Sequence, residues 1–158
     1  MTYNKTTKKE AKGLKVSTKG RYAVRMLLDI ALNQNGDPVP LKDIAARQHI
    51  SKKYLEQIAS QLTQAGIIAA VRGQAGGYRL IGAPETHDLY SILRVTEGPM
   101  HPVACLDLSP NECPRRDLCM TLPMWEGLDR VIRDYLSGIT LQDLINRAPA
   151  QPEHSGNC

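Results

Sequence analysis

Residues 50–68 read ISKKYLEQIASQLTQAGII, and this stretch decides the fold that we expect for the whole chain. Ser51 is a residue type that caps the N-terminus of a helix, and Gly66 is the type that most often ends one. Between them the apolar residues recur at helical spacing and predict one buried face: Leu55, Ile58, Ala59 and Leu62. The other face carries lysines and polar side chains, which predicts a basic surface.

The segments on either side of this helix predict a winged helix-turn-helix. Upstream, Ser17 or Thr18 is expected to cap an amphipathic helix, and a short helix is expected from Leu41 onward. Downstream, IIAAV and YRLI flank the glycine-rich RGQAGG, which is typical of a β-hairpin. The predicted fold class is mainly α with a small β-hairpin wing, followed by a long C-terminal helix.

The second half of the chain predicts further helices separated by a proline-interrupted segment. Thr86 is expected to cap a helix that ends near Gly98, and Pro123 suits the first turn of a longer helix with one apolar face. Thr140 is expected to cap a short final helix. In order, the expected regions are a flexible basic arm (1–15), a winged helix-turn-helix region (16–82), a connecting helix (83–99), a cysteine loop (100–122), the long helix with the final short helix (123–147) and a disordered tail (148–158).

Charge is distributed unevenly along the chain. Residues 1–80 carry a net charge of +9, whereas residues 81–158 carry −5. A basic half that contains a helix-turn-helix predicts double-stranded DNA as its partner. The first residues lack the apolar core of a signal peptide, and no stretch approaches the ~20 apolar residues that cross a bilayer. We therefore expect a cytoplasmic protein that has no membrane partner.

The DNA-binding residues are expected on the second helix of the motif and on the hairpin. A recognition helix places its N-terminal residues in the major groove. There Gln57 suits adenine, the two lysines suit phosphate or guanine, and Glu56 is a candidate for tuning sequence preference. Arg72 of the wing suits a narrow minor groove. The full set of expected DNA-binding residues is Ser51, Lys52, Lys53, Tyr54, Glu56, Gln57, Arg72 and Gln74.

Three of the four cysteines lie within fifteen positions, at Cys105, Cys113 and Cys119. In a reducing cytosol, clustered cysteines are more often metal ligands or redox groups than structural disulfides. Prolines interrupt this segment, and an irregular loop allows three thiolates to converge on one centre. The fourth cysteine, Cys158, belongs to the expected disordered tail and is predicted to be an exposed thiol.

Four stretches together resemble the Rrf2 family of winged helix-turn-helix transcription regulators, of the IscR, NsrR and CymR type: STKGRYAVRMLLDIAL, ISKKYLEQIASQLTQAGII, VRGQAGGYRL and WEGLDRVIRDYLSGITLQDLI. The resemblance covers residues 14–146. It implies a homodimer, with 123–137 as the dimerisation helix, that binds a partly palindromic operator. It also implies that Cys105, Cys113 and Cys119 ligate an iron–sulfur cluster, 2Fe-2S in preference to 4Fe-4S.

Two features depart from the cluster-binding members of that family. The gaps between the three cysteines are seven and five residues, whereas those members usually have two gaps of the shorter length. Leu122 occupies the position of the usual histidine ligand, so the fourth ligand is unassigned. The candidates are His101, Asp107, Glu112, Asp117, a residue of the partner subunit, an exogenous thiol or an open iron site. A zinc site, a thiol redox switch and inert cysteines stay open as alternatives.

The predicted function is that of a repressor whose operator binding is controlled by the cluster and which senses redox state or nitric oxide. The alternative is a cofactor-free regulator of the CymR type, controlled by thiol redox state or by a metabolic enzyme as a protein partner. An enzyme is not expected, because the sequence shows no nucleophile, base and acid arrangement and no phosphate-binding glycine loop.

Overall fold

The helix-turn-helix predicted around residue 50 is present. The computed structural model describes residues 15–107 and 110–147, so the expected C-terminal tail with Cys158 and most of the expected basic arm lie outside it. Its helices are α1 (Thr18–Asn33), α2 (Leu41–Gln48), α3 (Lys52–Gln64), α4 (Leu89–Glu97), α5 (Leu122–Ser137) and α6 (Leu141–Arg147). Its strands are β1 (Ile68–Val71) and β2 (Gly77–Leu80), and short 3₁₀ helices span Pro84–Thr86, Ala104–Leu106 and Arg116–Leu118. The predicted fold class, mainly α with a hairpin wing, is therefore confirmed.

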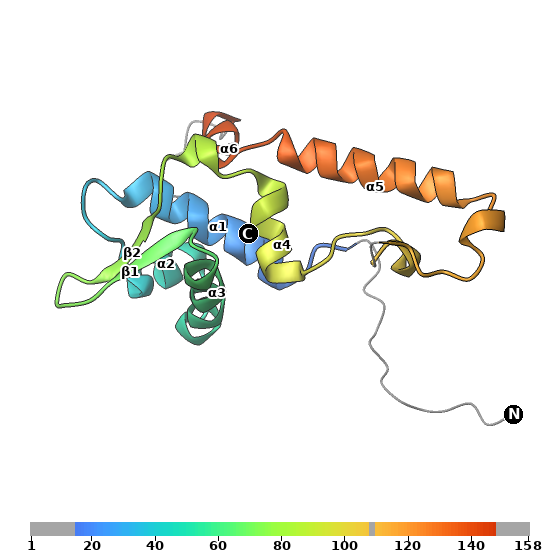
Figure 1. Ribbon diagram of the computed structural model, residues 1–158. Coiled ribbons are helices and arrows are strands. Elements are labelled where there is room, and N and C mark those ends of the chain that lie inside the picture. The colour runs from blue at the N-terminus through green and yellow to red at the C-terminus, as the bar shows by residue number, and fades with distance from the viewer. Residues whose placement is uncertain (1–14, 108–109, 148–158) are drawn as a thin grey trace, which may run out of the picture.

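One helix stands apart from the others. Figure 1 shows α1 to α4, the hairpin and α6 gathered in one body, while α5 extends away from it. The segment that joins α4 to α5 runs outward beside α5, and α5 then returns toward α6. None of the α5 residues is buried. Among the described residues, no helix is both long enough and apolar enough to span a membrane.

Side-chain caps fix where three of the helices begin, as the sequence predicts. The hydroxyl of Ser17 accepts a hydrogen bond from a backbone N–H in the first turn of α1, and Ser51 does the same for α3. At α6, Thr140 and Asp143 exchange bonds: the Asp143 carboxylate accepts from the Thr140 N–H, and the Thr140 hydroxyl accepts from the Asp143 N–H. Such reciprocal caps satisfy donors that the helix itself leaves unpaired.

The prediction that Thr86 caps α4 is wrong. The Thr86 hydroxyl donates to the carbonyl of Ala83 and closes a 3₁₀ turn instead. Asp88 caps α4, and its carboxylate accepts from both the N–H and the hydroxyl of Ser91. Aspartate and threonine are both common caps, so residue type alone did not distinguish the two positions.

The hydrophobic core lies where α1, α2 and α3 meet β1, α4 and α6. All four residues predicted for the inner face of α3 are fully buried. Burying an aliphatic side chain of this size contributes about 1.5–3 kcal/mol, so the fit of α3 against α1 stabilises the motif. The largest fully buried side chains are Met26, Leu27, Ile30, Ile44, Leu55, Ile58, Leu62, Ile68, Ile92 and Leu141.

The wing is a two-stranded antiparallel hairpin in which Ile68 pairs with Leu80 and Val71 pairs with Gly77. Tyr78 also exchanges backbone hydrogen bonds with Val39, in the loop before α2, which joins the wing to the helix-turn-helix. A Cβ atom at Gly77 would lie 2.3 Å from the carbonyl oxygen of Val39. Only glycine allows this approach, so the base of the wing is fixed by contact with its own chain.

Candidate nucleic-acid interface and cysteine loop

The N-terminal half of α3 presents the residues expected to meet DNA. Once Leu55 and its neighbours turn inward, Lys52, Lys53, Glu56 and Gln57 are left exposed on the outer face. Glu56 lies 3.8 Å from the Lys52 ammonium, one turn away, so it partly neutralises that lysine. Lys53 forms no ion pair with any described residue and is free to hold a phosphate.

Two members of the expected set also have structural roles. Ser51 caps α3 with its hydroxyl, so this oxygen is already used as an acceptor. Tyr54 is half-buried and packs against the core, with its ring edge-on to Tyr22 of α1 at a centroid distance of 5.8 Å. Only part of the Tyr54 side chain is therefore available to a ligand.

The tip of the wing is exposed. Arg72 and Gln74, the two wing residues expected to meet DNA, are both exposed. Between them Gly73 has φ of +121°, a conformation that other residues rarely adopt. The tip therefore presents Arg72 on a tight turn at the end of a short hairpin, where it has the reach to enter a groove beside the recognition helix.

A shallow hollow of about 540 Å³ lies between α3 and the first turn of α1. It brings Lys19 of α1 next to the outer face of α3, where Lys53 and Gln57 also line it. The sequence analysis missed Lys19, although its place just after the Ser17 cap was a usable signal, because helix N-termini attract phosphate. The remaining lining residues are Glu56, Ser60 and Gln61.

A polar network holds the turn between α2 and α3 against α1. The Asp29 carboxylate accepts from Arg47 Nη2 at 2.6 Å and from Gln48 Nε2 at 2.9 Å. Arg25, also on α1, donates to the side-chain oxygen of Gln48 at 3.0 Å and lies over the ring of Tyr22. The hydrogen bond to Asp29 and the charge of that carboxylate raise the pKa of Arg47. The start of α3 is thus positioned by charge pairs as well as by the core.

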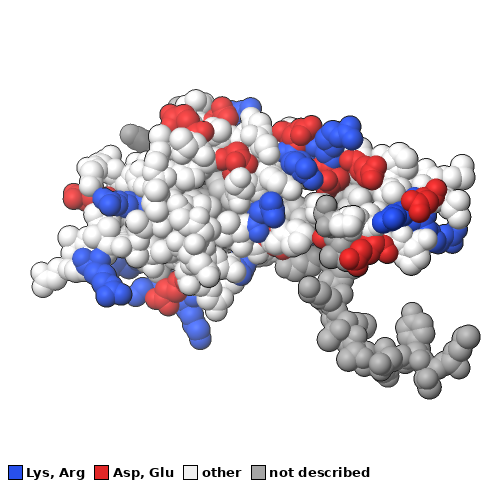
Figure 2. All heavy atoms as spheres, in the orientation of Figure 1, with Lys and Arg blue, Asp and Glu red and all other residues white. Residues whose placement is uncertain are grey.

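One edge of the surface is predominantly basic, as the sequence predicts, whereas acidic and basic groups are mixed over α5 (Figure 2). In Figure 2 the lysine and arginine side chains along the lower left edge lie over the hairpin and α3, with one acidic group among them. Acidic groups are more frequent over α5 and α6. The basic side coincides with the expected DNA-binding residues, which is the arrangement required for contact with a polyanion.

The cysteine loop joins α4 to α5 and is mostly irregular. Cys105 lies in the 3₁₀ helix Ala104–Leu106, and Cys119 follows the 3₁₀ helix Arg116–Leu118. Cys105, Cys113 and Cys119 are free and partly exposed. The Cys119 sulfur lies 3.4 Å from the Thr121 hydroxyl, and hydrogen bonds from the side chain and backbone of Thr121 lower the pKa of this thiol.

The donor chemistry of this loop fits an iron–sulfur cluster, because it offers three free thiols on a mostly irregular backbone. Within residues 15–107 and 110–147, however, no three His, Cys, Asp or Glu side chains form a group that could hold a metal ion. Binding a cluster therefore requires the loop to draw its sulfurs together. The residues that the sequence proposed as ligands are present, but they are not gathered in the single chain.

The candidates for a fourth ligand lie in different surroundings. His101 Nδ1 lies 2.7 Å from Asp129 Oδ1 on α5, and both side chains are largely buried. Asp117 pairs with Arg116 at 3.4 Å, whereas Asp107 and Glu112 are exposed. The His101 contact connects the start of the cysteine loop directly to α5, and this connection was not apparent from the sequence.

A helix-turn-helix with an exposed basic second helix and a hairpin wing defines a winged-helix DNA-binding protein. Residues 16–147 match the Rrf2 family model, which is described as an iron-dependent transcriptional regulator. The chain belongs to this family, and it is a transcriptional regulator and not an enzyme.

Named relatives and solved structures agree with this assignment. The HTH-type transcriptional regulator IscR of Vibrio vulnificus is 39% identical over 133 residues, which cover 84% of this chain and 78% of that relative. The structure of T. potens IscR has a TM-score of 0.70 at 38% identity and covers 91% of this chain and 95% of its own. CymR, the global cysteine regulator of B. subtilis, has a TM-score of 0.69 at 35% identity, with 85% and 98% covered.

Proposed function

We propose that this regulator is a homodimer that represses transcription from a partly palindromic operator, and that a 2Fe-2S cluster at Cys105, Cys113 and Cys119 controls its affinity for DNA. The observation that carries this proposal is the position of the three cysteines. All three lie in the segment that joins α4 of the DNA-binding body to the start of α5, so a change in this loop acts on both parts.

The outer face of α5 supports a second copy of the chain as its partner. Six of the nine large hydrophobic side chains that are exposed among the described residues fall within 118–135. Met124, Val131 and Tyr135 recur at helical spacing and are 56%, 64% and 66% exposed. An apolar stripe of this kind on one helix suits an isologous interface, in which the same helix of a partner covers it. A two-fold dimer presents its two recognition helices about 34 Å apart, one turn of DNA.

Each part of the DNA-binding body has a role in this proposal. The N-terminal half of α3 enters the major groove, with Gln57 directed at base edges and Lys53 at phosphate. The hairpin brings Arg72 to the adjacent minor groove. Lys19 adds a phosphate contact beside α3. The Asp29 network holds α3 at a fixed angle, so the position of these groups follows the position of the whole body.

A change at the cysteines is transmitted to α5 through the contact between His101 and Asp129, and so alters the affinity for DNA. When bound, the cluster supplies an iron centre whose loss or oxidation is a chemical signal. Cys105, Cys113 and Cys119 would hold it as thiolates, which would require the loop to bring the three sulfurs together. Because His101 at the start of that loop bonds to α5, the loop and the helix shift together. A coupling of about 1–3 kcal/mol changes affinity by 5–150-fold.

The direct test is anaerobic purification with analysis of iron, sulfide and zinc. Wild-type protein and the Cys158→Ala control should contain iron and sulfide in equal amounts and absorb visible light, whereas Cys113→Ala should contain neither. Gel-shift titration against a duplex selected from a random library then compares cluster-loaded and cluster-free protein. Stoichiometric zinc without sulfide would contradict the cluster while leaving the DNA-binding role intact.

A second candidate is control by thiol redox state or by a metabolic enzyme as a protein partner, with no cofactor. The observation that favours it is that the described cysteines are free and do not gather into a metal-binding group. In that case colourless protein should lose or gain DNA affinity when treated with a thiol oxidant, and the change should reverse with a reductant. Cys119→Ser should abolish the response if this thiol is the sensor.

A further inference from the structure

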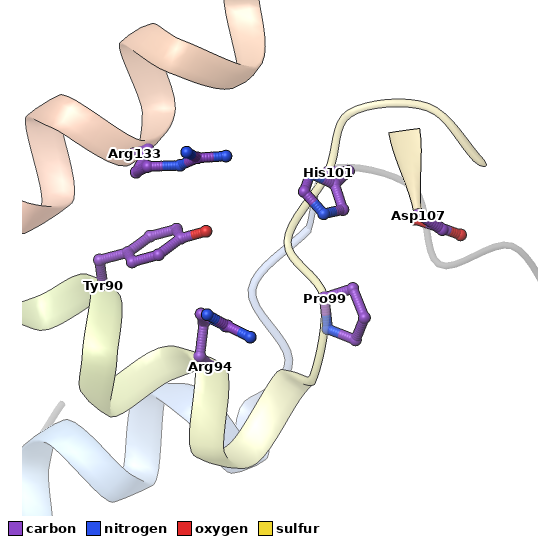
Figure 3. A pocket seen from close by; sticks show the side chains of 6 residues that line it. All are labelled: Tyr90, Arg94, Pro99, His101, Asp107 and Arg133. Atoms are coloured by element: carbon purple, nitrogen blue, oxygen red, sulfur yellow. The ribbon is translucent and has the colours of Figure 1, made fainter. Parts of the chain in front are cut away.

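A pocket of about 380 Å³ lies where α4, the start of the cysteine loop and α5 meet. Figure 3 shows Tyr90 and Arg94 reaching it from α4 and Arg133 reaching it from α5, with Pro99 and His101 on the opposite side. The proposed DNA-binding surface and cluster site use neither Tyr90, Arg94 nor Arg133. Asp107, at the far end, completes the lining.

Two guanidinium groups flank the Tyr90 ring in this pocket. Arg94 lies 5.9 Å from the ring centroid and Arg133 lies 6.0 Å from it. Arg133 donates from Nη2 to Asp129 at 2.9 Å, and its guanidinium also hydrogen-bonds the Tyr90 hydroxyl. Within the described part of the chain, no oxygen accepts a hydrogen bond from the Arg94 guanidinium. The Arg94 guanidinium therefore offers unused N–H donors, and the Tyr90 hydroxyl, which lies between the two arginines (Figure 3), can still donate its own proton.

The described carboxylates near the pocket do not neutralise Arg94. Asp129 is already engaged by both His101 and Arg133, and its side chain is only 14% exposed. Asp107 is exposed and lies on the side of the pocket away from the arginines (Figure 3). Asp107 is the only acidic side chain among the described residues that line the pocket. Guanidinium groups recognise carboxylate and phosphate oxygens through paired hydrogen bonds.

We propose that this pocket binds a small molecule through a carboxylate or phosphate group, which bridges Arg94 of α4 and Arg133 of α5 with the Tyr90 hydroxyl as a third donor. Such a ligand ties α5 to the DNA-binding body and so acts as an effector. The site does not compete with the proposed dimer contact, because Arg133 lies over Tyr90 of α4 and Asp129 bonds to His101, whereas Met124 and Val131 lie on the exposed stripe of α5.

The test is an NMR titration of the full chain with two probes, inorganic phosphate and succinate, at constant ionic strength set with chloride. Saturable shifts of the Tyr90 and Arg94 signals are expected with at least one probe, and the probe that binds identifies the anion class. Arg94→Gln and Arg133→Gln should each weaken binding about tenfold, equivalent to about 1.4 kcal/mol. The matched control Arg130→Gln, an exposed arginine on α5, should leave it unchanged.

Tyr90→Phe provides a second test in case the arginine variants misfold, because it removes one hydroxyl and keeps the ring. It should weaken binding by a smaller factor without lowering the melting temperature. Cys113→Ala should bind the probes as wild type does, so failure of the cluster proposal does not affect this result. The absence of saturable shifts with both probes, or equal weakening by Arg130→Gln, would overturn the proposal.

Discussion

Asp29 of α1 and Arg47 of α2 form a two-pronged ion pair, with Arg47 Nη2 2.6 Å from one carboxylate oxygen and Arg47 Nε 3.0 Å from the other. The Asp29 side chain is only 2% exposed, whereas that of Arg47 is 40% exposed. The carboxylate is thus buried at the edge of the core, and its partners come from the last turn of α2. This pair fixes the angle at which the chain enters the recognition helix.

Replacing Asp29 should therefore destabilise the fold. Asp29→Asn keeps the size of the side chain but removes the charge-assisted hydrogen bonds to Arg47; because Arg47 is partly exposed and stays hydrated, we expect the free energy of unfolding to fall by about 1.5–3 kcal/mol. Urea denaturation followed by circular dichroism measures the change. The control Asp37→Asn, at an exposed turn residue, should change stability by less than about 0.5 kcal/mol. A loss below about 1 kcal/mol for Asp29→Asn would mean that the pair contributes little.

Substitutions at two neighbouring positions of α3 should separate phosphate contact from base recognition. Lys53→Ala should weaken binding to all duplexes about equally and reduce the slope of log K against log salt by about 1. Gln57→Ala should leave that slope unchanged and reduce discrimination against a mismatched base pair by about 1–3 kcal/mol. Fluorescence anisotropy at several salt concentrations measures both quantities. Identical behaviour of the two variants would argue against α3 as the recognition helix.

The helix-turn-helix could be predicted from sequence because local signals agree there. Ser51 caps α3, the apolar spacing matches a helix, and Gly66 follows its end, so each signal leads to the same answer. The Asp29–Arg47 pair could not be predicted. Its members are eighteen positions apart, and a charged residue inside an apolar face gives no indication of its partner.

The cysteine loop could be predicted from the sequence only in part. Its irregular backbone was predictable from the prolines, but the contact between His101 and Asp129 crosses 28 positions and has no local signature. The apolar stripe of α5 was predicted as one face of a helix, and its exposure is the observation on which the proposed dimer rests. Contacts that depend on a second chain or on a bound group cannot be derived from periodicity.

The glycine at the base of the wing gives a third prediction. Gly77→Ala places a Cβ atom 2.3 Å from the carbonyl oxygen of Val39, so the bridge between Val39 and Tyr78 must open. We expect the free energy of unfolding to fall by about 1–3 kcal/mol and the affinity for operator DNA to fall with it. Thermal unfolding and anisotropy measure the two effects. Gly127→Ala on α5, where a Cβ meets no neighbouring atom, is the matched control and should not destabilise the fold.

The exposed stripe of α5 gives a fourth prediction, which depends on the proposed dimer. Val131→Asp places a charge in the middle of that stripe, and burying it against a second copy is unfavourable. We expect the dimer dissociation constant to rise at least about 100-fold, equivalent to about 2.7 kcal/mol, while the circular dichroism spectrum is unchanged. Sedimentation velocity over a range of concentrations measures this. The control Arg130→Gln should remain dimeric, and dimerisation of Val131→Asp at wild-type concentrations would place the interface elsewhere.

The cap of α6 gives a prediction about pH. The backbone N–H and then the hydroxyl of Thr140 donate to the Asp143 carboxylate, and both bonds lower its pKa below the ordinary value. Because the pKa is lower in the folded state than in the unfolded state, the stabilisation is complete above the unfolded pKa of about 3.9. It is lost as the pH falls through the folded pKa. Asp143→Asn should therefore melt at a lower temperature than wild type at pH 7, and the difference should shrink below about pH 4. Thermal unfolding from pH 7 to pH 3, with Asp37→Asn as the reference, measures this, and a difference that stays constant over the whole range would show that the charge of Asp143 does not stabilise the cap.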